Sequence, residues 1–112
     1  MSEQLELSIL WNKMLGNLKR KTELPTIPKN REPIWFTAVS DGNCIYVSKA
    51  KDHMPSSQIS IERKLRYKEF ERIYPVYLKR EAGMAVSEEA CRLTHNQVYW
   101  FSIIHHCGIK II

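Results

Sequence analysis

A strongly apolar segment near the end of the sequence stands out from an otherwise mixed pattern of hydrophobic and polar residues. Between positions 94 and 108 the chain reads THNQVYWFSIIHHCG, and the middle of this segment offers almost no polar side. Because apolar residues point in nearly every direction around the axis, a helix here would be buried on most sides. The segment 94–107 is therefore predicted to be the helix around which the domain packs.

Residues at both ends of this segment fit the termini of a helix. Thr94 and Gln97 have the spacing of a capping box, in which a hydroxyl and a side-chain amide satisfy free backbone N–H groups. Leu93 and Val98 stand where a hydrophobic staple would form, and Gly108 stands where a left-handed C-cap would end the helix.

Residues 34–49 carry the clearest β pattern. Two apolar segments, IWFTAVS and NCIYVSK, flank Asp41-Gly42, a strong signal for a two-residue hairpin turn. That turn would place Ala38 opposite Ile45 and Phe36 opposite Val47, with all four side chains on one apolar face. A two-stranded hairpin alone is marginally stable, so a third strand is predicted over 58–63, where apolar and polar residues alternate.

The other face of this hairpin mixes aromatic and polar residues, among them Trp35 and Tyr46. Two interpretations remain open for it. Another element of the fold can cover the face, or its aromatic side chains can form a binding platform for bases or for a protein partner.

The N-terminal part has its own helical pattern. Apolar residues recur at steps of three and four from Leu7 to Leu18, which predicts an amphipathic helix over 3–18 that either docks on the core or meets a partner. Three prolines between positions 19 and 33 predict an extended linker. The predicted division is therefore a helix over 1–21, a linker over 22–33 and a core domain over 34–112.

Two further helices are predicted before the central one. Helical spacing extends over 67–82, although Pro75 should produce a kink or two shorter helices. Ser87 is a plausible N-cap for a short helix over 88–93. Together these elements define an α+β fold, with a small antiparallel sheet packed against C-terminal helices and an amphipathic helix at the N-terminus.

The composition narrows the class of protein without identifying it. The 112 residues are 44% hydrophobic and 26% charged, which is ordinary for a globular domain. No apolar run approaches the ~18 residues of a membrane span, and the first residues, MSEQLELS, lack the basic region of a signal peptide. Three cysteines without paired spacing favour a reduced, cytoplasmic protein.

The charge is concentrated in one stretch. The formal net charge is +5, and residues 63–80 alone account for that excess, with only Glu69 and Glu71 opposing the basic residues there. Aromatic residues lie between the basic ones, and this combination suits phosphate contacts and base stacking. Equally, the aromatic residues can be a buried helical stripe and the charges its solvated back. The basic residues concerned are Arg63, Lys64, Arg66, Lys68, Arg72, Lys79 and Arg80.

The last two predicted helices also resemble a helix-turn-helix unit, because a tight connection joins them. In that interpretation Asn96 and Gln97 would read base edges, since both amides can bond to adenine. The second helix, however, carries no Lys or Arg. The alternative is an ordinary capped core helix.

Signals for metal binding and catalysis are weak. Cys91 and His95 are four residues apart, but no CxxC or HExxH spacing is present. Cys44 and Cys107 lie in no recognisable nucleophile motif, and the four glycines are scattered rather than gathered into a phosphate loop. We therefore expect no metal, no cofactor and no catalytic activity.

Two functional hypotheses follow. The first is a small, basic, non-catalytic protein that binds nucleic acid, DNA above all, through the seven basic residues of 63–80, with Asn96 and Gln97 as base readers. The second is a protein-interaction module, for an acidic protein partner, or a homodimer. Its contact residues would be Leu7 and Trp11 of the N-terminal helix or Trp35 and Tyr46 of the sheet face.

Overall fold

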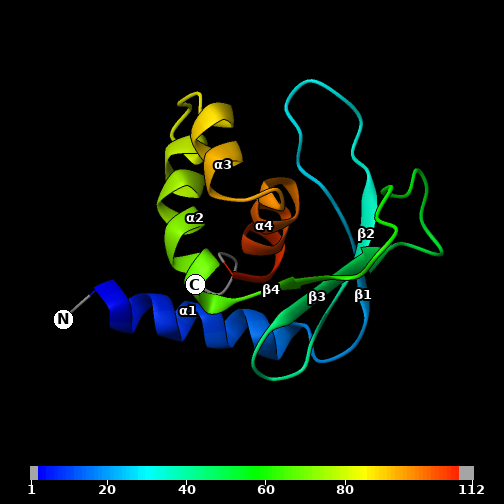
Figure 1. Ribbon diagram of the computed structural model, residues 1–112, viewed down its shortest axis with the longest axis horizontal. Helices are drawn as coiled ribbons and strands as arrows, with labels where there is room; N and C mark the ends of the chain where they lie inside the picture. Colours follow the sequence, from blue (N-terminus) through cyan, green and yellow to red (C-terminus); the bar gives the residue numbers. More distant parts are fainter. Residues whose placement is uncertain (1–2, 109–112) are drawn as a thin grey trace.

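A computed structural model describes residues 3–108 of the chain, and the side chains from residue 6 onward. The order of elements is α1 (Glu3–Asn17), β1 (Thr22–Pro25), β2 (Trp35–Ser40), β3 (Ile45–Lys49), β4 (Arg63–Leu65), α2 (Tyr67–Glu81), α3 (Ser87–Leu93), α4 (Gln97–Ile103) and a π-helical turn, η1 (Ile104–Gly108). The strands form an antiparallel sheet in the order β1-β2-β3-β4 (Figure 1). This arrangement confirms the predicted α+β class.

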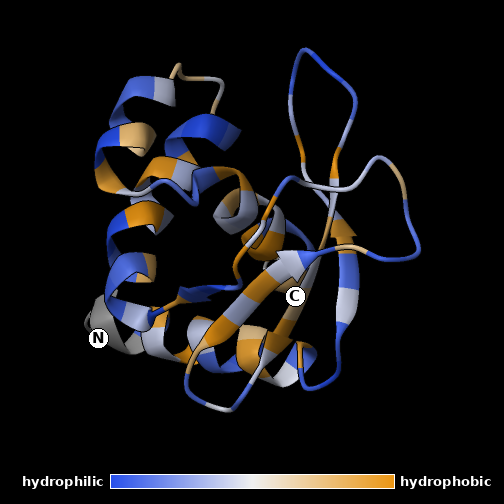
Figure 2. Ribbon diagram, turned by 45° about the vertical axis from the view of Figure 1, so that its right-hand side comes forward, coloured by the Kyte–Doolittle hydropathy of each residue, from blue (hydrophilic) through white to orange (hydrophobic). Residues whose placement is uncertain are grey.

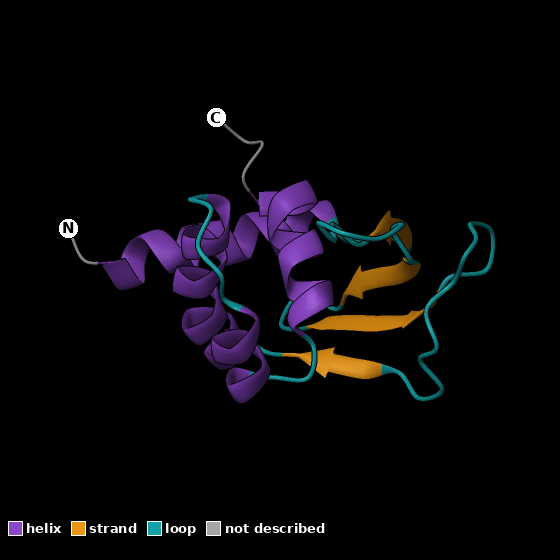
Figure 3. Cartoon of the chain, turned by 90° about the horizontal axis from the view of Figure 1, so that it is seen from above, coloured by secondary structure: helices purple, strands orange, loops and turns teal. Residues whose placement is uncertain are grey.

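The molecule has a helical side and a sheet side (Figure 3). Phe36, Ala38, Ile45 and Val47 are all fully buried, so the predicted apolar face of the hairpin does point into the core. Hydrophobic segments alternate with polar ones along the strands, and polar residues dominate the long loops (Figure 2). The alternation follows from the two-residue period of a strand, which sends successive side chains to opposite faces.

The register of the hairpin differs from the prediction by two residues. Ser40 pairs with Ile45 and Ala38 with Val47, so four residues, 41–44, form the connection. The Asp41 carboxylate accepts the backbone N–H groups of Asn43 and Cys44, both at 2.8 Å, and Gly42 has a positive φ of 95°. This side-chain bonding stabilises a wider turn, and a shift of two residues leaves every side chain on its predicted face.

Two of the strands lie elsewhere than predicted. Residues 22–25, expected within an extended linker, pair with β2 as strand β1, with Leu24 opposite Phe36. Pro25 ends this strand at the edge of the sheet, where proline is tolerated. The predicted strand over 58–63 is displaced to Arg63–Leu65. Ile59 is still buried, whereas Ile61 is 79% exposed. The Ile61 side chain would therefore gain no burial if residue 61 were paired in a strand.

The predicted central helix is buried, but it begins later than expected. Trp100, Ile103 and Ile104 are fully buried in α4 and η1. The capping box does not form: Thr94 ends α3, and its hydroxyl accepts the backbone N–H of Asn96 at 3.0 Å. The predicted staple is also absent, because Val98 is exposed.

Gly108 has a packing role instead of the predicted left-handed C-cap. Among the described residues only Gly42 and Gly83 have a positive φ. A Cβ at Gly108 would lie 3.1 Å from a methyl group of Leu10 and 3.3 Å from the sulfur of Met14. The absence of a side chain therefore allows η1 to approach α1 closely.

The N-terminal helix docks on the core. Trp11, Met14 and Leu18 are buried in the same cluster as the sheet residues, and the Asn17 amide donates to the Cys107 carbonyl oxygen at 2.7 Å. The cluster joins α1 to the sheet, and the hydrogen bond joins it to η1. The apolar stripe of α1 is thus used inside the molecule.

The two remaining helices differ from prediction in detail. Helix α2 continues through Pro75 as one element, so the version with two shorter helices is wrong. Helix α3 starts at Ser87 rather than after it, with Val86 at the N-cap position and no side-chain cap. Its first turn contains Glu88 and Glu89, which suit the positive end of the helix dipole.

Replacement of Trp100 by alanine should cost about 3–5 kcal/mol of unfolding free energy, because it opens a large cavity at a fully buried position. The matched control is Val98→Ala, in the same helix but 38% exposed, which should change stability by less than about 0.5 kcal/mol. Urea unfolding of both variants measures the difference. Equal losses would show that α4 is not the centre of the core.

Candidate nucleic-acid interface

Four of the seven predicted basic residues form an exposed strip from β4 into the first half of α2. Lys64, Arg66, Lys68 and Arg72 are all exposed, and the described residues contain no carboxylate within ion-pair distance of any of them. Lys68 and Arg72 are four apart in α2 and therefore lie on the same face of the helix. We refer to these four residues as the basic strip.

Lys64 connects the basic strip to the outer face of the sheet. It pairs with Tyr46 across β3 and β4, and its ammonium nitrogen lies 5.8 Å from the centre of the Tyr46 ring. The Tyr46 hydroxyl donates to Asp41 at 3.0 Å, and this bond to a carboxylate raises the pKa of Tyr46. Tyr46 is thus a half-buried aromatic ring beside Lys64, whose charge also acts on the nearby Asp41 carboxylate.

Arg63 and Arg80 serve the interior of the fold. Arg63 donates to the Asn96 side-chain oxygen at 3.0 Å and stacks over Tyr99 at 5.6 Å. Arg80 donates to the Ile27 carbonyl oxygen, and its guanidinium carbon lies 5.1 Å from the centre of the Phe101 ring of α4. Both guanidinium groups therefore attach neighbouring segments to α4.

Lys79 is also engaged. Its ammonium group lies 3.1 Å from a carboxylate oxygen of Glu89, and this ion pair joins α2 to α3. Three of the seven predicted phosphate contacts thus have partners within the fold, and the remaining four are the basic strip.

The two predicted base readers do not lie free at a helix surface. The Asn96 oxygen accepts from Arg63, and the Gln97 amide donates to the Cys91 sulfur at 3.0 Å. The body of α4 is buried, including Tyr99 and Trp100. Among its described residues α4 thus exposes little besides Val98, and the helix-turn-helix interpretation gains no support from this surface.

The aromatic residues within the basic segment belong to the core. Phe70 and Tyr77 are fully buried, and burial raises the pKa of Tyr77 to about 12. Phe70 lies between Trp11 and Trp100, with ring centres 5.4 and 5.9 Å away. Tyr67 and Tyr74 pack against the core but stay partly exposed. Base stacking is therefore closed to Phe70 and Tyr77 only.

Glu69 points away from the basic strip, although it lies next to Lys68 in sequence. Its carboxylate accepts the Thr94 hydroxyl at 2.8 Å and also the indole N–H of Trp100. The single acidic residue in the first turn of α2 is thus bonded to the segment around α4. Its position leaves the outer surface of that turn more basic than the sequence alone suggests.

Most residues predicted for the alternative protein-protein interface already make contacts within the fold. Trp11 is buried and Leu7 packs against the core. On the sheet, Trp35 is stacked on His53, with ring centres 4.0 Å apart and planes 17° from parallel. The outer sheet face therefore keeps only part of its aromatic surface.

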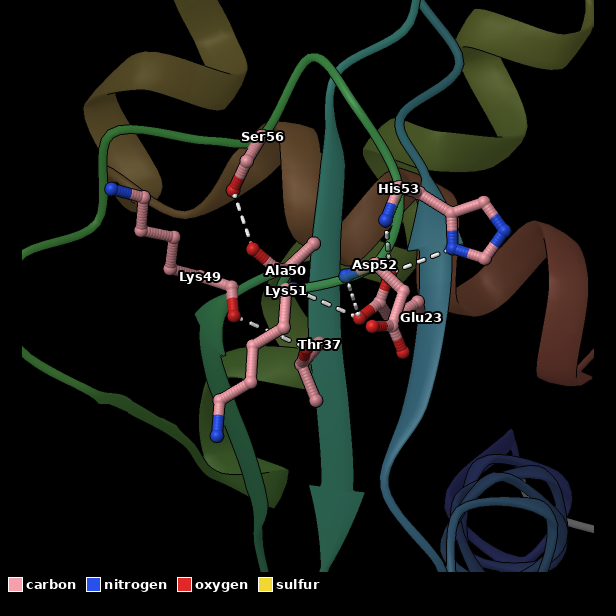
Figure 4. A network of polar contacts seen from close by, with 8 residues as sticks. All are labelled: Glu23, Thr37, Lys49, Ala50, Lys51, Asp52, His53 and Ser56. Carbon is pink, nitrogen blue, oxygen red and sulfur yellow. Dashed lines mark hydrogen bonds and ion pairs between the residues drawn. The ribbon is translucent and has the colours of Figure 1, made fainter.

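A further polar cluster, which sequence reasoning missed, fixes the loop after β3 (Figure 4). The Glu23 carboxylate of β1 accepts three consecutive backbone N–H groups, from Lys51, Asp52 and His53, each at 2.9 Å. It also lies 2.7 Å from the Nδ1 atom of His53. These bonds, the one from Asp52 above all, lower the pKa of Glu23 to about 2. No sequence signal links positions 23 and 53, since the contact depends on the unpredicted strand β1.

Comparisons with known proteins give no relationship on which to base a function. No protein-family model matches the chain, no curated protein matches its sequence, and no solved structure matches its fold. Within residues 3–108, no three side chains of His, Cys, Asp or Glu come together as metal ligands. None of the described helices has the length and apolar character needed to cross a bilayer.

Glu23→Gln should destabilise the protein at neutral pH, because an amide accepts the three loop N–H groups less strongly than a carboxylate does. The folded-state pKa of Glu23 lies below the ordinary value of 4.5, at about 2. The stabilisation is thus complete above pH 4.5 and is lost as the pH falls toward 2. The difference in unfolding free energy between wild type and variant should shrink over that interval.

Urea unfolding at a series of pH values measures this difference. Glu32→Gln is the control, since Glu32 is exposed and forms no ion pair with any described residue. If the difference in unfolding free energy between wild type and Glu23→Gln is the same at neutral and acidic pH, the stabilising role assigned to the Glu23 carboxylate is contradicted.

Proposed function

We propose that this chain is a small, cytoplasmic, non-catalytic protein that binds nucleic acid, DNA above all, through the phosphate backbone. The observation that carries the proposal is the basic strip: four exposed cations within nine residues, none paired with a described carboxylate. Unpaired lysine and arginine side chains displace counterions from phosphates, and this release supplies most of the affinity of non-specific binding.

The spacing of the strip suits a polyanion. Lys68 and Arg72 are separated by four residues of helix, or about 6 Å along its axis. Two steps along one strand of DNA cover about 7 Å. Lys68 and Arg72 can therefore meet phosphates two steps apart along one strand. Arg66 directly precedes α2, and Lys64 lies in β4 at the edge of the sheet.

The structural role of Glu69 supports the same interpretation. A carboxylate that faced outward at this position would repel phosphate and compete for Lys68 or Arg72. Its bonds to Thr94 and Trp100 direct it inward instead. The positive end of the α2 dipole adds to the attraction for anions on that turn.

The protein-interaction alternative has less support. The apolar stripe of α1 is buried in the core. A partner could therefore not bind Trp11 unless α1 first detached from the domain. Tyr46 remains half-buried on the outer sheet face beside Lys64, and it fits a stacking contact next to a phosphate at least as well as a protein contact.

Charge reversal of the strip tests the proposal. The triple variant Arg66→Glu, Lys68→Glu, Arg72→Glu should abolish binding to a fluorescent DNA duplex while leaving the fold intact, because all three side chains are exposed. For wild type, four phosphate contacts predict that log K falls with log salt concentration with a slope of about −3.6. Fluorescence anisotropy over a salt series measures both quantities.

The matched control is Lys13→Glu, Lys21→Glu, Lys51→Glu, which changes the formal charge by the same amount at exposed positions outside the strip. This variant should retain most of the affinity. If both triple variants weaken binding equally, the effect is one of net charge and the strip is not the site. If neither does, nucleic-acid binding through this surface is refuted.

A further inference from the structure

A groove with a volume of about 870 Å³ lies at the end of α2 remote from Lys68 and Arg72. One wall is the connection between β1 and β2, over residues 26–34, and the opposite wall comes from the segment 83–91 and from α4. This volume is within the range of sites that bind small ligands, about 300–1,000 Å³.

Two polar atoms in the wall of the groove lack partners. Ser57 is only 3% exposed, and its hydroxyl oxygen has no hydrogen-bond partner. The side-chain oxygen of Gln97 is likewise buried and unpaired, while the nitrogen of the same amide donates to Cys91. Ser57, Gln97 and Cys91 all line the groove. Because buried polar groups in proteins are nearly always hydrogen-bonded, these two atoms mark a place where a ligand would complete the bonding.

The rest of the lining is apolar inside and charged at the mouth, where Glu32 lies beside the basic residues and the Lys29 ammonium group donates to the Arg80 carbonyl oxygen at 3.4 Å. Ile34, Val86 and Tyr99 supply apolar and aromatic surface. Lys29 and Arg31 are exposed residues of the 26–34 wall. A ligand that fits has a flat or apolar body, two hydrogen-bonding atoms and a negative charge outside the groove.

We propose that this groove binds a nucleotide, with the base inside and the phosphate near Lys29 and Arg31. An exocyclic amino group of the base donates to the Gln97 side-chain oxygen, and the Ser57 hydroxyl donates to the adjacent ring nitrogen. The faces of the base contact the apolar lining, as unstacked bases do in proteins that bind single strands.

This bonding pattern selects among bases. Adenine and cytosine carry an exocyclic amino group, whereas thymine presents a carbonyl oxygen in its place. That carbonyl would oppose the Gln97 oxygen, acceptor against acceptor, and leave it unpaired. The groove should therefore prefer adenine or cytosine over thymine.

The nucleotide has two chemical sources, a free mononucleotide and an unstacked nucleotide of a single strand. The second source rests on the proposed function, whereas the first does not. Adenosine monophosphate, measured by calorimetry, probes the groove alone. Single strands of about 12 adenines or 12 thymines, measured by anisotropy, probe the groove together with the basic strip.

Ser57→Ala and Gln97→Met remove one bond each, and Gln58→Met is the matched control at an exposed amide on the same groove. Each of the first two variants should weaken binding of adenosine monophosphate and of the adenine strand by about three- to tenfold. Binding of the thymine strand should not change, and Gln58→Met should match wild type. Circular dichroism of the variants checks that the fold is retained.

Alkylation provides a second readout within the wild-type chain. Cys91 is an exposed free thiol in the groove, and Cys44 is a free thiol outside it. Adenosine monophosphate should slow the reaction of Cys91 with iodoacetamide and leave that of Cys44 unchanged, as followed by mass spectrometry.

The outcomes separate this inference from the proposed function. The nucleotide site in the groove is refuted if adenine and thymine strands bind equally, if Ser57→Ala and Gln97→Met leave binding unchanged, and if the mononucleotide does not slow alkylation of Cys91. This holds even if the basic strip binds DNA. The nucleotide site is supported if the mononucleotide slows alkylation of Cys91 and if Ser57→Ala and Gln97→Met both bind the mononucleotide more weakly. This holds even if charge reversal of the basic strip has no effect on DNA binding. In that case the free mononucleotide is its ligand.

Discussion

The packing of Trp100 against helices α1 and α2 is the contact on which the rest of the structure depends. Its ring is fully buried and lies 5.9 Å from both Trp11 and Phe70, and its indole N–H bonds to Glu69. One side chain thus joins the N-terminal helix, the basic helix and the C-terminal helix. The same contact determines which side of α2 faces the solvent, and so determines the position of Lys68 and Arg72.

The functional surface follows from how charged side chains are divided between structure and solvent. Arg63, Arg80 and Lys79 attach loops and helices to one another, while Glu69 is bonded inward. What is left on the outside is the unpaired basic strip. Hydrogen bonds to charged groups are stronger than hydrogen bonds between neutral groups. Arg63 and Arg80 therefore stabilise the fold and are not available to a ligand. In the proposals made above, the strip contacts phosphates and the groove holds a base.

Much of the fold could be predicted from the sequence because local patterns decide it. The alternation around Ala38 and Val47 identified the buried face, and the apolar segment near Trp100 identified the central helix. The register was missed because Asp41 stabilises a wider turn with its own carboxylate. Strand β1 was missed because its short pairing with β2 is non-local, and because Pro25 together with Pro28 and Pro33 predicted a linker.

The candidate site could be predicted only in part, for a related reason. The sequence shows that residues 63–80 are basic, but it does not show that Arg63 meets Asn96 or that Lys79 meets Glu89, since these partners are distant along the chain. The groove was not foreseen, because its lining combines segments that are distant along the chain, such as those of Ser57 and Gln97.

The most direct test of the central claim is a map of backbone amide chemical shifts on addition of a short DNA duplex at low salt. The account predicts that the signals of residues 64–72 move together and return as salt is added, because phosphates contact the basic strip there. Shifts confined to the outer sheet face around Trp35, or no shifts at all, would contradict it.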